Sequence, residues 1–529
     1  MYDYIIVGAG SAGCVLANRL SEDPAVSVLL LEAGPSDWHP FVHMPAGLAK
    51  LVGNKGVNWD YNTAPDPELG NRSLWWPRGK VLGGSSSINA MCYIRGHARD
   101  YDEWQSLGAE GWNWNAVLPY FKRSEGNSRG ASELHGGDGP LGVSDHRYGN
   151  PLSPVFLEAS KQAGLPVNDD FNGAQQEGMG WYQTTTRNGA RCSSADAYLK
   201  PVRARPNLKV VTHALASRVT FEDGRANGVV YSVAGKGGFC EGARREVILC
   251  GGAINSPQLL MLSGIGPAAH LRQHGIEVRV DLPGVGGNLQ DHLDTCTIRR
   301  CTQDITYDKT NDVLIGLQYY LFKQGPGTSN IAETGGFLRS PLAEDDRPDL
   351  QLHFVPAQLD DHGRNRLPGS GYTLHVCFLR PKSRGRVSLA SANPGDKARI
   401  DPGYLNDAGG FDLKVMIEAV RLSRKIFAQE AFAPFRGPEL FPGEQAQSDA
   451  EIVDFIRRKA ESIYHPVGTC KIGRDDDPDA VVDAQLRVRG VKGLRVVDAS
   501  VMPKLIGGNT NAPTMMIAER AADLILGRI

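Results

Sequence analysis

The sequence lacks the features that mark several common classes of protein. No apolar run approaches the roughly 18 residues of a membrane-spanning helix, and no basic, apolar leader stands at the amino terminus. The nine cysteines are dispersed and form no CxxC pair, which argues against a zinc ribbon or a thioredoxin-like motif. There is no basic surplus, because 57 Lys and Arg stand against 59 Asp and Glu. A role in binding nucleic acid is therefore not expected.

These absences favour one cellular setting. An odd number of scattered cysteines suits reduced thiols in the cytoplasm better than a disulfide framework. We therefore expect a cytoplasmic protein, and peripheral contact with the inner face of a membrane is compatible with the composition. With 529 residues, the chain is long enough for roughly three to four domain-sized units and a large core.

Glycine is the residue present in excess. The 62 glycines follow no period, so a collagen-like structure is excluded. Glycine permits tight turns and a close approach of backbone to a ligand, and the clearest such cluster lies at the start of the chain.

The amino-terminal residues have the pattern of a dinucleotide-binding unit. Residues 4–7 predict a short buried strand, residues 8–13 read Gly-Ala-Gly-Ser-Ala-Gly, and residues 14–20 have helical apolar spacing. A second strand is predicted at 28–31, and Glu32 follows it, 19 residues after the last glycine of the loop. Strand, loop, helix, strand and acid thus occur in the order and spacing of a dinucleotide site.

Each of these residues has a physical role in such a site. Gly8 allows the tight turn, Gly10 lets the backbone approach a pyrophosphate, and Gly13 lets the helix pack on the strand. The helix amino terminus then offers free N–H groups to the phosphates. The Glu32 carboxylate would accept from ribose hydroxyls and would repel a 2′-phosphate, which disfavours NADP. The motif alone leaves NAD and FAD open.

Further motifs lie along the whole chain. They are Arg-Gly-Lys-Val-Leu-Gly-Gly-Ser-Ser-Ser-Ile-Asn-Ala-Met-Cys-Tyr-Ile-Arg-Gly at 78–96, Gly-Ala-Ile-Asn-Ser-Pro-Gln-Leu-Leu-Met-Leu-Ser-Gly-Ile-Gly at 252–266, Tyr-His-Pro-Val-Gly-Thr-Cys at 464–470, Val-Asp-Ala-Ser at 497–500 and Gly-Asn-Thr-Asn-Ala-Pro-Thr at 508–514. Together these motifs resemble the glucose–methanol–choline (GMC) oxidoreductase family, which binds FAD. Within the family, the runs at 91–97 and 289–292 are similar to bacterial choline dehydrogenases and to the alcohol dehydrogenases of alkane oxidation.

The resemblance implies an α/β fold in which a doubly wound FAD-binding domain is joined to a sheet-and-helix (α+β) substrate domain. Both domains are expected to be discontinuous: the FAD-binding domain at 1–150, 190–296 and 476–529, and the substrate-binding domain at 151–189 and 297–475. Local patterns predict strands at 207–213, 218–233 and 245–250, a half-buried sheet that includes 349–355 and 372–379, and helices at 411–429, 449–462 and 513–525.

The resemblance also implies the residues around FAD. Besides Gly8, Gly10, Gly13 and Glu32, it assigns to the cofactor Ser11, Ala12, Ala33, Gly79, Gly83, Gly84, Ser85, Asn89, Ala90, Met91, Val219, Asp498, Ala499, Asn509, Thr510 and Asn511. In choline oxidases of the family, a histidine that bonds covalently to FAD fills the place of Ile88. Because isoleucine cannot form that bond, we expect FAD to be bound non-covalently.

Two polar residues are the candidates for catalysis. A neutral imidazole is a natural base for an alcohol proton at neutral pH, and His465 occupies the position of the family's catalytic histidine. Its partner in the family is His or Asn, and here Asn509 is expected to position the alkoxide. No metal is expected. His97, His292 and His353 are interpreted as structural, and Glu333 as a hydrogen-bonded or solvated loop acid.

The predicted reaction is the oxidation of a primary alcohol to an aldehyde. FAD takes the hydride at N5, and the electrons pass to a quinone-type acceptor. Choline dehydrogenation, an oxidase reaction with O₂ and a flavin-containing hydroxynitrile lyase remain as alternatives. The aromatic residues of 300–380 are expected in the core or around the substrate; they are Tyr307, Tyr319, Tyr320, Phe322, Phe354 and Phe378.

Overall fold

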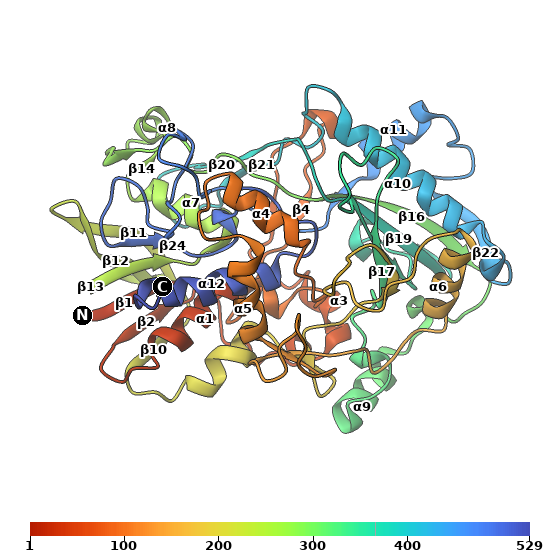
Figure 1. The fold of residues 1–529 in the computed structure, drawn as a ribbon, viewed down its shortest axis with the longest axis horizontal. Coiled ribbons are helices and arrows are strands. Elements are labelled where there is room, and N and C mark those ends of the chain that lie inside the picture. The colour runs from red at the N-terminus through yellow and green to blue at the C-terminus, as the bar shows by residue number, and fades with distance from the viewer. Residues whose placement is uncertain (366) are drawn as a thin grey trace.

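The computed structural model describes residues 1–365 and 367–529, and two large β-sheets organise this part of the chain (Figure 1). The first sheet has the spatial order β10 (Leu208–Val211), β2 (Val28–Leu31), β1 (Tyr2–Val7), β13 (Lys236–Leu249), β12 (Arg225–Val233) and β11 (Ala214–Glu222), with β24 (Leu494–Val496) also paired to β13. The strands β10, β2, β1, the end of β13 and β24 run parallel. This sheet confirms the predicted α/β class and the predicted strands at 28–31 and within 218–233.

The strand β13 joins two parts of this sheet. Its first residues pair antiparallel with β12 and continue the β11–β12 hairpin, whereas its last residues lie between β1 and β24. The centre of the parallel sheet is therefore built from the two ends of the chain. Figure 1 shows both termini at the end of the molecule that holds this sheet.

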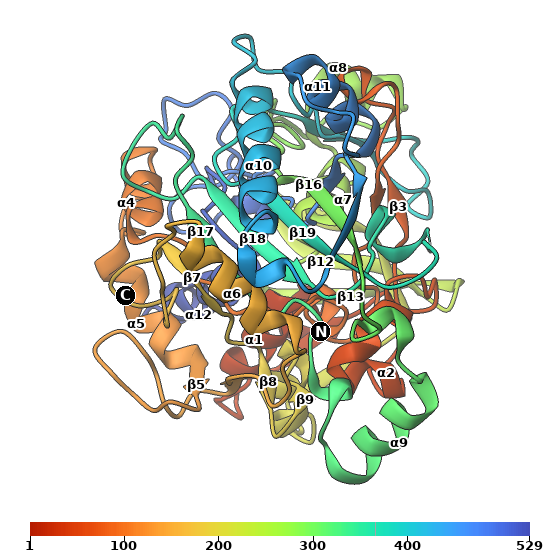
Figure 2. The ribbon, with the colours of Figure 1, turned by 90° about the vertical axis from the view of Figure 1, so that its right-hand side faces the viewer.

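The second sheet is antiparallel and covers the nucleotide-binding part. Its order is β22 (Arg436–Phe441), β16 (Leu293–Cys301), β19 (Gly371–Phe378), β18 (Leu350–Val355), β17 (Thr334–Leu338) and β7 (Gly178–Trp181), with β23 (Glu461–Ser462) also paired to β16. Figure 2 shows the helices α6 (Leu152–Gln162) and α10 (Phe411–Phe427) across one face of this sheet. The helix α11 (Asp449–Lys459) packs against α10, so both predicted helices of this region are confirmed.

The structure corrects one expectation for this sheet. Strands β18 and β19 are buried at every residue, not half-buried. Leu350, Leu352 and Phe354 face the helices, while Gln351 and His353 alternate with them on the other face. That second face is polar because it forms part of the wall of an internal cavity. The alternation of residues therefore distinguishes a face toward the cavity from a face toward the core; neither face is toward water.

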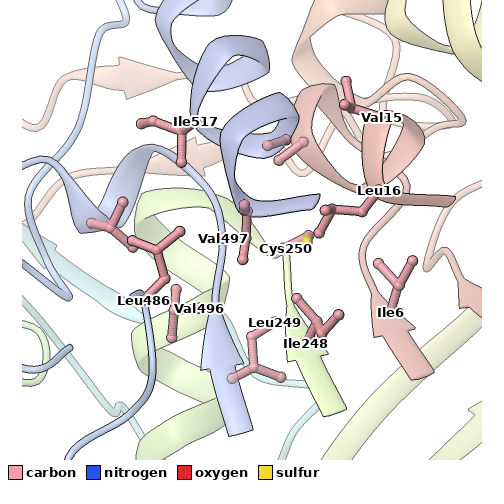
Figure 3. Close-up of a cluster of buried hydrophobic side chains, with 14 of the residues drawn as sticks. Ile6, Val15, Leu16, Ile248, Leu249, Cys250, Leu486, Val496, Val497 and Ile517 are labelled. Carbon is pink, nitrogen blue, oxygen red and sulfur yellow. The ribbon is translucent and has the colours of Figure 1, made fainter. Parts of the chain in front are cut away.

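The helices α1 (Ser11–Leu20) and α12 (Asn511–Ile525) pack on each other beside the parallel sheet. Figure 3 shows the core between them, where side chains from β1, β13, β24, α1 and α12 meet: Ile6, Val15, Leu16, Ile248, Leu249, Val496 and Ile517. Met515 and Met516 on α12 are fully buried, as a core role requires. The domain division along the chain stays a prediction.

Two further observations concern the outside of the molecule. Within the described ranges, every helix is too short or too polar to cross a bilayer. Tyr320 and Phe322, which were expected in the core or at a pocket, are exposed on helix α9 (Asp312–Phe322), whereas Tyr319, Phe354 and Phe378 are buried as expected.

Candidate active site

A cavity of about 1140 Å³ lies between the two sheets and holds most of the predicted site residues. Those on its wall are Gly8, Gly10, Ser11, Ala12, Glu32, Ala33, Gly79, Gly84, Ser85, Asn89, Ala90, Met91, His465, Asp498, Ala499, Asn509, Thr510 and Asn511. They come from six separate stretches of chain, so the fold brings together residues that are far apart in the sequence. Ile88 is also on this wall.

Three predicted residues do not line the cavity. A Cβ on Gly13 would lie 1.8 Å from the Gly8 carbonyl oxygen, so Gly13 serves the packing of α1 on β1. Gly83 has φ +87° and turns the chain before Gly84. The Val219 amide donates to Ser263 Oγ at 2.9 Å, and the strand β11 instead contributes Ala214–Ala216 to the wall.

The glycine loop provides space for a diphosphate. An added Cβ on Gly10 would meet only the Gly84 Cα, at 3.9 Å, because the loop opens into the cavity there. At Gly84, by contrast, φ is +54° and a Cβ would lie 2.7 Å from Gly10 Cα, so the two glycine motifs touch through backbone alone. A cradle of this shape, at the amino terminus of α1, fits a dinucleotide diphosphate.

Glu32 is fixed at the end of β2 by the same loop. Its carboxylate accepts from the Ala9 amide at 2.9 Å and from the Gly34 amide at 2.8 Å. Burial raises the pKa of Glu32 to about 7, although these two amides oppose the shift. Each oxygen keeps a free lone pair on the cavity wall, which is what a ribose partner needs.

The carboxyl-terminal motifs close the cavity from the other side. Ser11 Oγ donates to Asn511 Oδ1 at 2.8 Å, which joins the start of α1 to the start of α12. Asp498 accepts from the Gly252 amide at 2.8 Å and from Ser256 Oγ at 2.6 Å, and so ties two family motifs together. The free N–H groups at the start of α12 carry partial positive charge. They therefore stabilise negative charge on a group bound next to them.

His465 is held in one tautomer by a chain of hydrogen bonds. His292 Nε2 lies 3.2 Å from the Leu379 carbonyl, which only accepts, so His292 donates from Nε2. Burial lowers the pKa of His292 to about 3, and the neutral ring therefore has an unprotonated Nδ1. His465 Nδ1 lies 2.9 Å from that atom and must be the donor. The Nε2 of His465 is thus unprotonated, and its lone pair can accept a hydrogen bond.

That lone pair is on the side of Asn509. Asn509 Nδ2 donates to His465 Nε2 at 3.1 Å, and Gln351 Nε2 donates to Asn509 Oδ1 at 2.9 Å, which fixes the orientation of the amide. Burial, reinforced by His292, lowers the pKa of His465 well below its ordinary value. The imidazole is therefore neutral over the physiological range and able to accept a proton.

The backbone of His465 is anchored by an acid that sequence reasoning did not single out. Asp291 accepts from the His465 amide at 2.7 Å, from Ser462 Oγ at 2.5 Å and from the Tyr404 hydroxyl. Burial raises the pKa of Asp291 to about 6. The preceding Tyr464 has φ +68°, a strained conformation that these hydrogen bonds hold in place. The signal in the sequence that could have pointed to this acid was the Leu-Gln-Asp-His run at 289–292.

Two histidines interpreted as structural lie at the site. His292 bonds directly to His465, and His353 is on the cavity wall with its Nε2 3.2 Å from Gln351 Nε2. Both therefore lie at the candidate site, and their interpretation as structural residues stays a prediction. His97 is structural, since its ring accepts from the Arg99 amide at the start of helix α4 (Ala98–Ser106). Glu333 is buried and accepts from Ser153 Oγ and Ser329 Oγ, which confirms a hydrogen-bonded acid.

Comparison with known proteins identifies the family of this chain. Family models described as GMC oxidoreductase match residues 2–294 and 381–518. The chain belongs to the GMC oxidoreductase family. It is 53% identical to an alcohol dehydrogenase [acceptor] of Pseudomonas putida, covering 100% of this chain and 96% of the relative. It is 52% identical to the mitochondrial choline dehydrogenase of Homo sapiens, covering 100% and 90%.

Solved structures agree with this assignment. The pyridoxine 4-oxidase of Mesorbium loti has 34% identity and a TM-score of 0.89, with 99% of this chain and 98% of that chain covered. The chain is therefore an FAD-dependent oxidoreductase, and like its family it acts on alcohol donors. The glycine cradle and the adjoining cavity fit this cofactor.

Proposed function

We propose that this protein oxidises a primary alcohol to an aldehyde, with His465 as the base and a quinone-type molecule as the final electron acceptor. The observation that carries the proposal is the neutral His465, whose unprotonated Nε2 accepts from Asn509 at the wall of the cavity. FAD, when bound in the cradle, supplies the acceptor for the hydride. The remaining chemistry belongs to the side chains.

The hydrogen bonds indicate how the proton is handled. The substrate hydroxyl donates to His465 Nε2 and displaces the Asn509 amide from it. The freed Asn509 N–H can then donate to the oxygen on which negative charge develops. As His465 becomes positively charged, its Nδ1–H bond to His292 strengthens, and the ring does not need to reorient. Removal of the hydroxyl proton raises the hydride donor strength of the adjacent carbon.

Choline is the second candidate, because relatives named choline dehydrogenase match the whole chain. A quaternary ammonium needs aromatic faces, and Trp75 and Tyr464 lie on the wall with ring centroids 6.3 Å apart. However, the Arg364 guanidinium already lies 4.8 Å from the centre of the Trp75 ring. A resident cation on that face favours an uncharged alcohol.

A comparison of two isosteric substrates tests this choice. Choline and 3,3-dimethylbutan-1-ol differ only in the charged nitrogen, so we expect a dye-linked assay to show higher kcat/KM for the neutral alcohol. A higher value for choline would contradict the preference while leaving alcohol oxidation intact. Failure of every alcohol to bleach the flavin anaerobically would instead favour a hydroxynitrile lyase.

The acceptor is tested separately. Enzyme reduced anaerobically by alcohol is mixed with air or with a soluble quinone, and flavin reoxidation is followed. We expect fast reoxidation by the quinone and slow reoxidation by O₂. The reverse order would identify an oxidase.

A further inference from the structure

The helix α9 presents apolar side chains to solvent. Val313, Leu314, Leu317, Tyr320 and Leu321 are between 47% and 77% exposed, and Phe322 at the helix end is 65% exposed. At about 100° per residue, the first five side chains share one face of the helix. Both Figure 1 and Figure 2 show α9 projecting from the body of the molecule.

This arrangement is the reverse of an ordinary surface helix, which keeps its polar side outward. The inner face of α9 is already in contact with the protein. Tyr319 is buried and its hydroxyl donates to the His43 carbonyl at 2.7 Å, while Ile315 and Gly316 line the cavity. The outer apolar face has no packing role within the described part of the chain.

We propose that α9 docks this enzyme on a lipid bilayer by inserting its outer face among the acyl chains. Between Asp312 and Lys323 the helix has no charged residue, so the whole outer face can enter an apolar phase. Asp312 itself is paired with Lys50 at 3.0 Å. Lys309 and Lys323 stand just before and just after the helix, where headgroup phosphates would accept from them.

The size of the patch favours a lipid surface over a second copy of the chain. An eleven-residue helix is about 16 Å long and about 10 Å wide. Its footprint on a flat partner is therefore on the order of 160 Å², a narrow convex ridge and not the broad complementary surface over which a standard protein interface buries about 800 Å² per partner. A bilayer needs only a few large apolar side chains on a convex element, which is what α9 presents.

The docking helix also borders the site, because Ile315 and Gly316 are on the cavity wall. Docking through α9 therefore places the cavity next to the bilayer, where apolar alcohols and quinones are concentrated. Lipid binding itself does not depend on the proposed alcohol substrate or on the acceptor, so the two proposals can fail separately.

Vesicle flotation of the FAD-loaded enzyme tests the proposal. We compare the unchanged protein with a triple variant, Leu314→Glu, Leu317→Glu and Leu321→Glu. The matched control carries Leu107→Glu, Val167→Glu and Leu342→Glu, which alters three exposed apolar residues elsewhere. We expect the protein and the control to float with phosphatidylcholine vesicles, and the α9 variant to bind at least about a hundredfold more weakly.

Three results would overturn the proposal. They are no flotation of the unchanged protein, equal flotation of the α9 variant, and binding confined to phosphatidylglycerol vesicles and abolished by salt. Gel filtration without lipid provides a further outcome, since a dimer that the α9 variant alone loses would assign the helix to a second copy. Thermal unfolding and dye-linked activity on a water-soluble alcohol should be unchanged in the α9 variant, which confirms that it is folded.

Discussion

His465 and His292 meet Nδ1 to Nδ1 at 2.9 Å, so one proton is shared between two buried imidazoles. A backbone carbonyl, that of Leu379, decides which ring holds it, because it can only accept from His292. The tautomer of His465 is therefore set by Leu379, a residue that directly follows β19 and does not line the cavity.

Replacement of His465 by alanine should remove the base. We expect the rate of flavin reduction by alcohol to fall by about 10²–10⁴-fold while FAD stays bound, because His465 lies apart from the glycine cradle. Anaerobic stopped-flow absorbance measures the rate. His97→Ala, outside the cavity, is the control, and near-normal reduction in His465→Ala would reject the assignment.

Two replacements of His292 distinguish its control of the His465 tautomer from a role in packing alone. His292→Asn keeps an acceptor at the position of Nδ1, whereas His292→Leu keeps volume and removes the acceptor. We expect kcat to fall by about ten- to a hundredfold in the leucine variant with KM little changed, and substantial recovery in the asparagine variant. Equal losses of kcat in both variants would assign His292 a packing role alone.

Replacement of Gly10 and replacement of Gly13 by alanine should have different effects on folding and on FAD binding. A Cβ on Gly10 enters only the cavity, so Gly10→Ala should leave the apoprotein folded but weaken FAD binding. A Cβ on Gly13 would overlap the Gly8 carbonyl, so Gly13→Ala should prevent correct folding of the loop. Circular dichroism and FAD titration distinguish the two. Gly53→Ala, where a Cβ meets no atom within 4 Å, should change neither property.

The absence of a nucleophile at Ile88 predicts that FAD can be removed. Ile88 lies on the cavity wall and cannot bond to the flavin. Acid precipitation should therefore release free flavin into the supernatant, which absorbance of the two fractions measures. A yellow pellet and a colourless supernatant would show a covalent link elsewhere.

Stability should decrease as the solution becomes alkaline. The Asp170 and Glu125 carboxylates raise the pKa of His135 from 6.5 to about 9. The folded state therefore binds the proton more tightly than the unfolded chain, so this contribution is complete below about pH 6.5 and is lost as pH rises through about 9. We expect the free energy of unfolding to fall by roughly 1–3 kcal/mol over that window. Urea denaturation measures it, and His135→Gln should give a flatter profile.

Local sequence patterns were sufficient to predict the elements whose structure depends on residues close together in the chain. The first strand, the glycine loop and α1 follow from periodicity and from the steric needs of Gly8 and Gly13. Tertiary contacts were not readable in the same way. His292 and His465 are 173 residues apart and meet because β16 pairs with β23. The alternation of apolar and polar residues in β18 predicted a strand with two different faces. It did not show that His353 borders a cavity.

The central strand arrangement has a consequence for biosynthesis. β13 lies between β1, at Tyr2–Val7, and β24, at Leu494–Val496, which is translated much later. Asn511, which receives the Ser11 hydroxyl, is made later still. A nascent chain on the ribosome therefore exposes one edge of β13 until β24 has been translated. We expect stable retention of the coenzyme only after β24 and α12 have joined the sheet, so a chain stopped before β24 should retain no flavin.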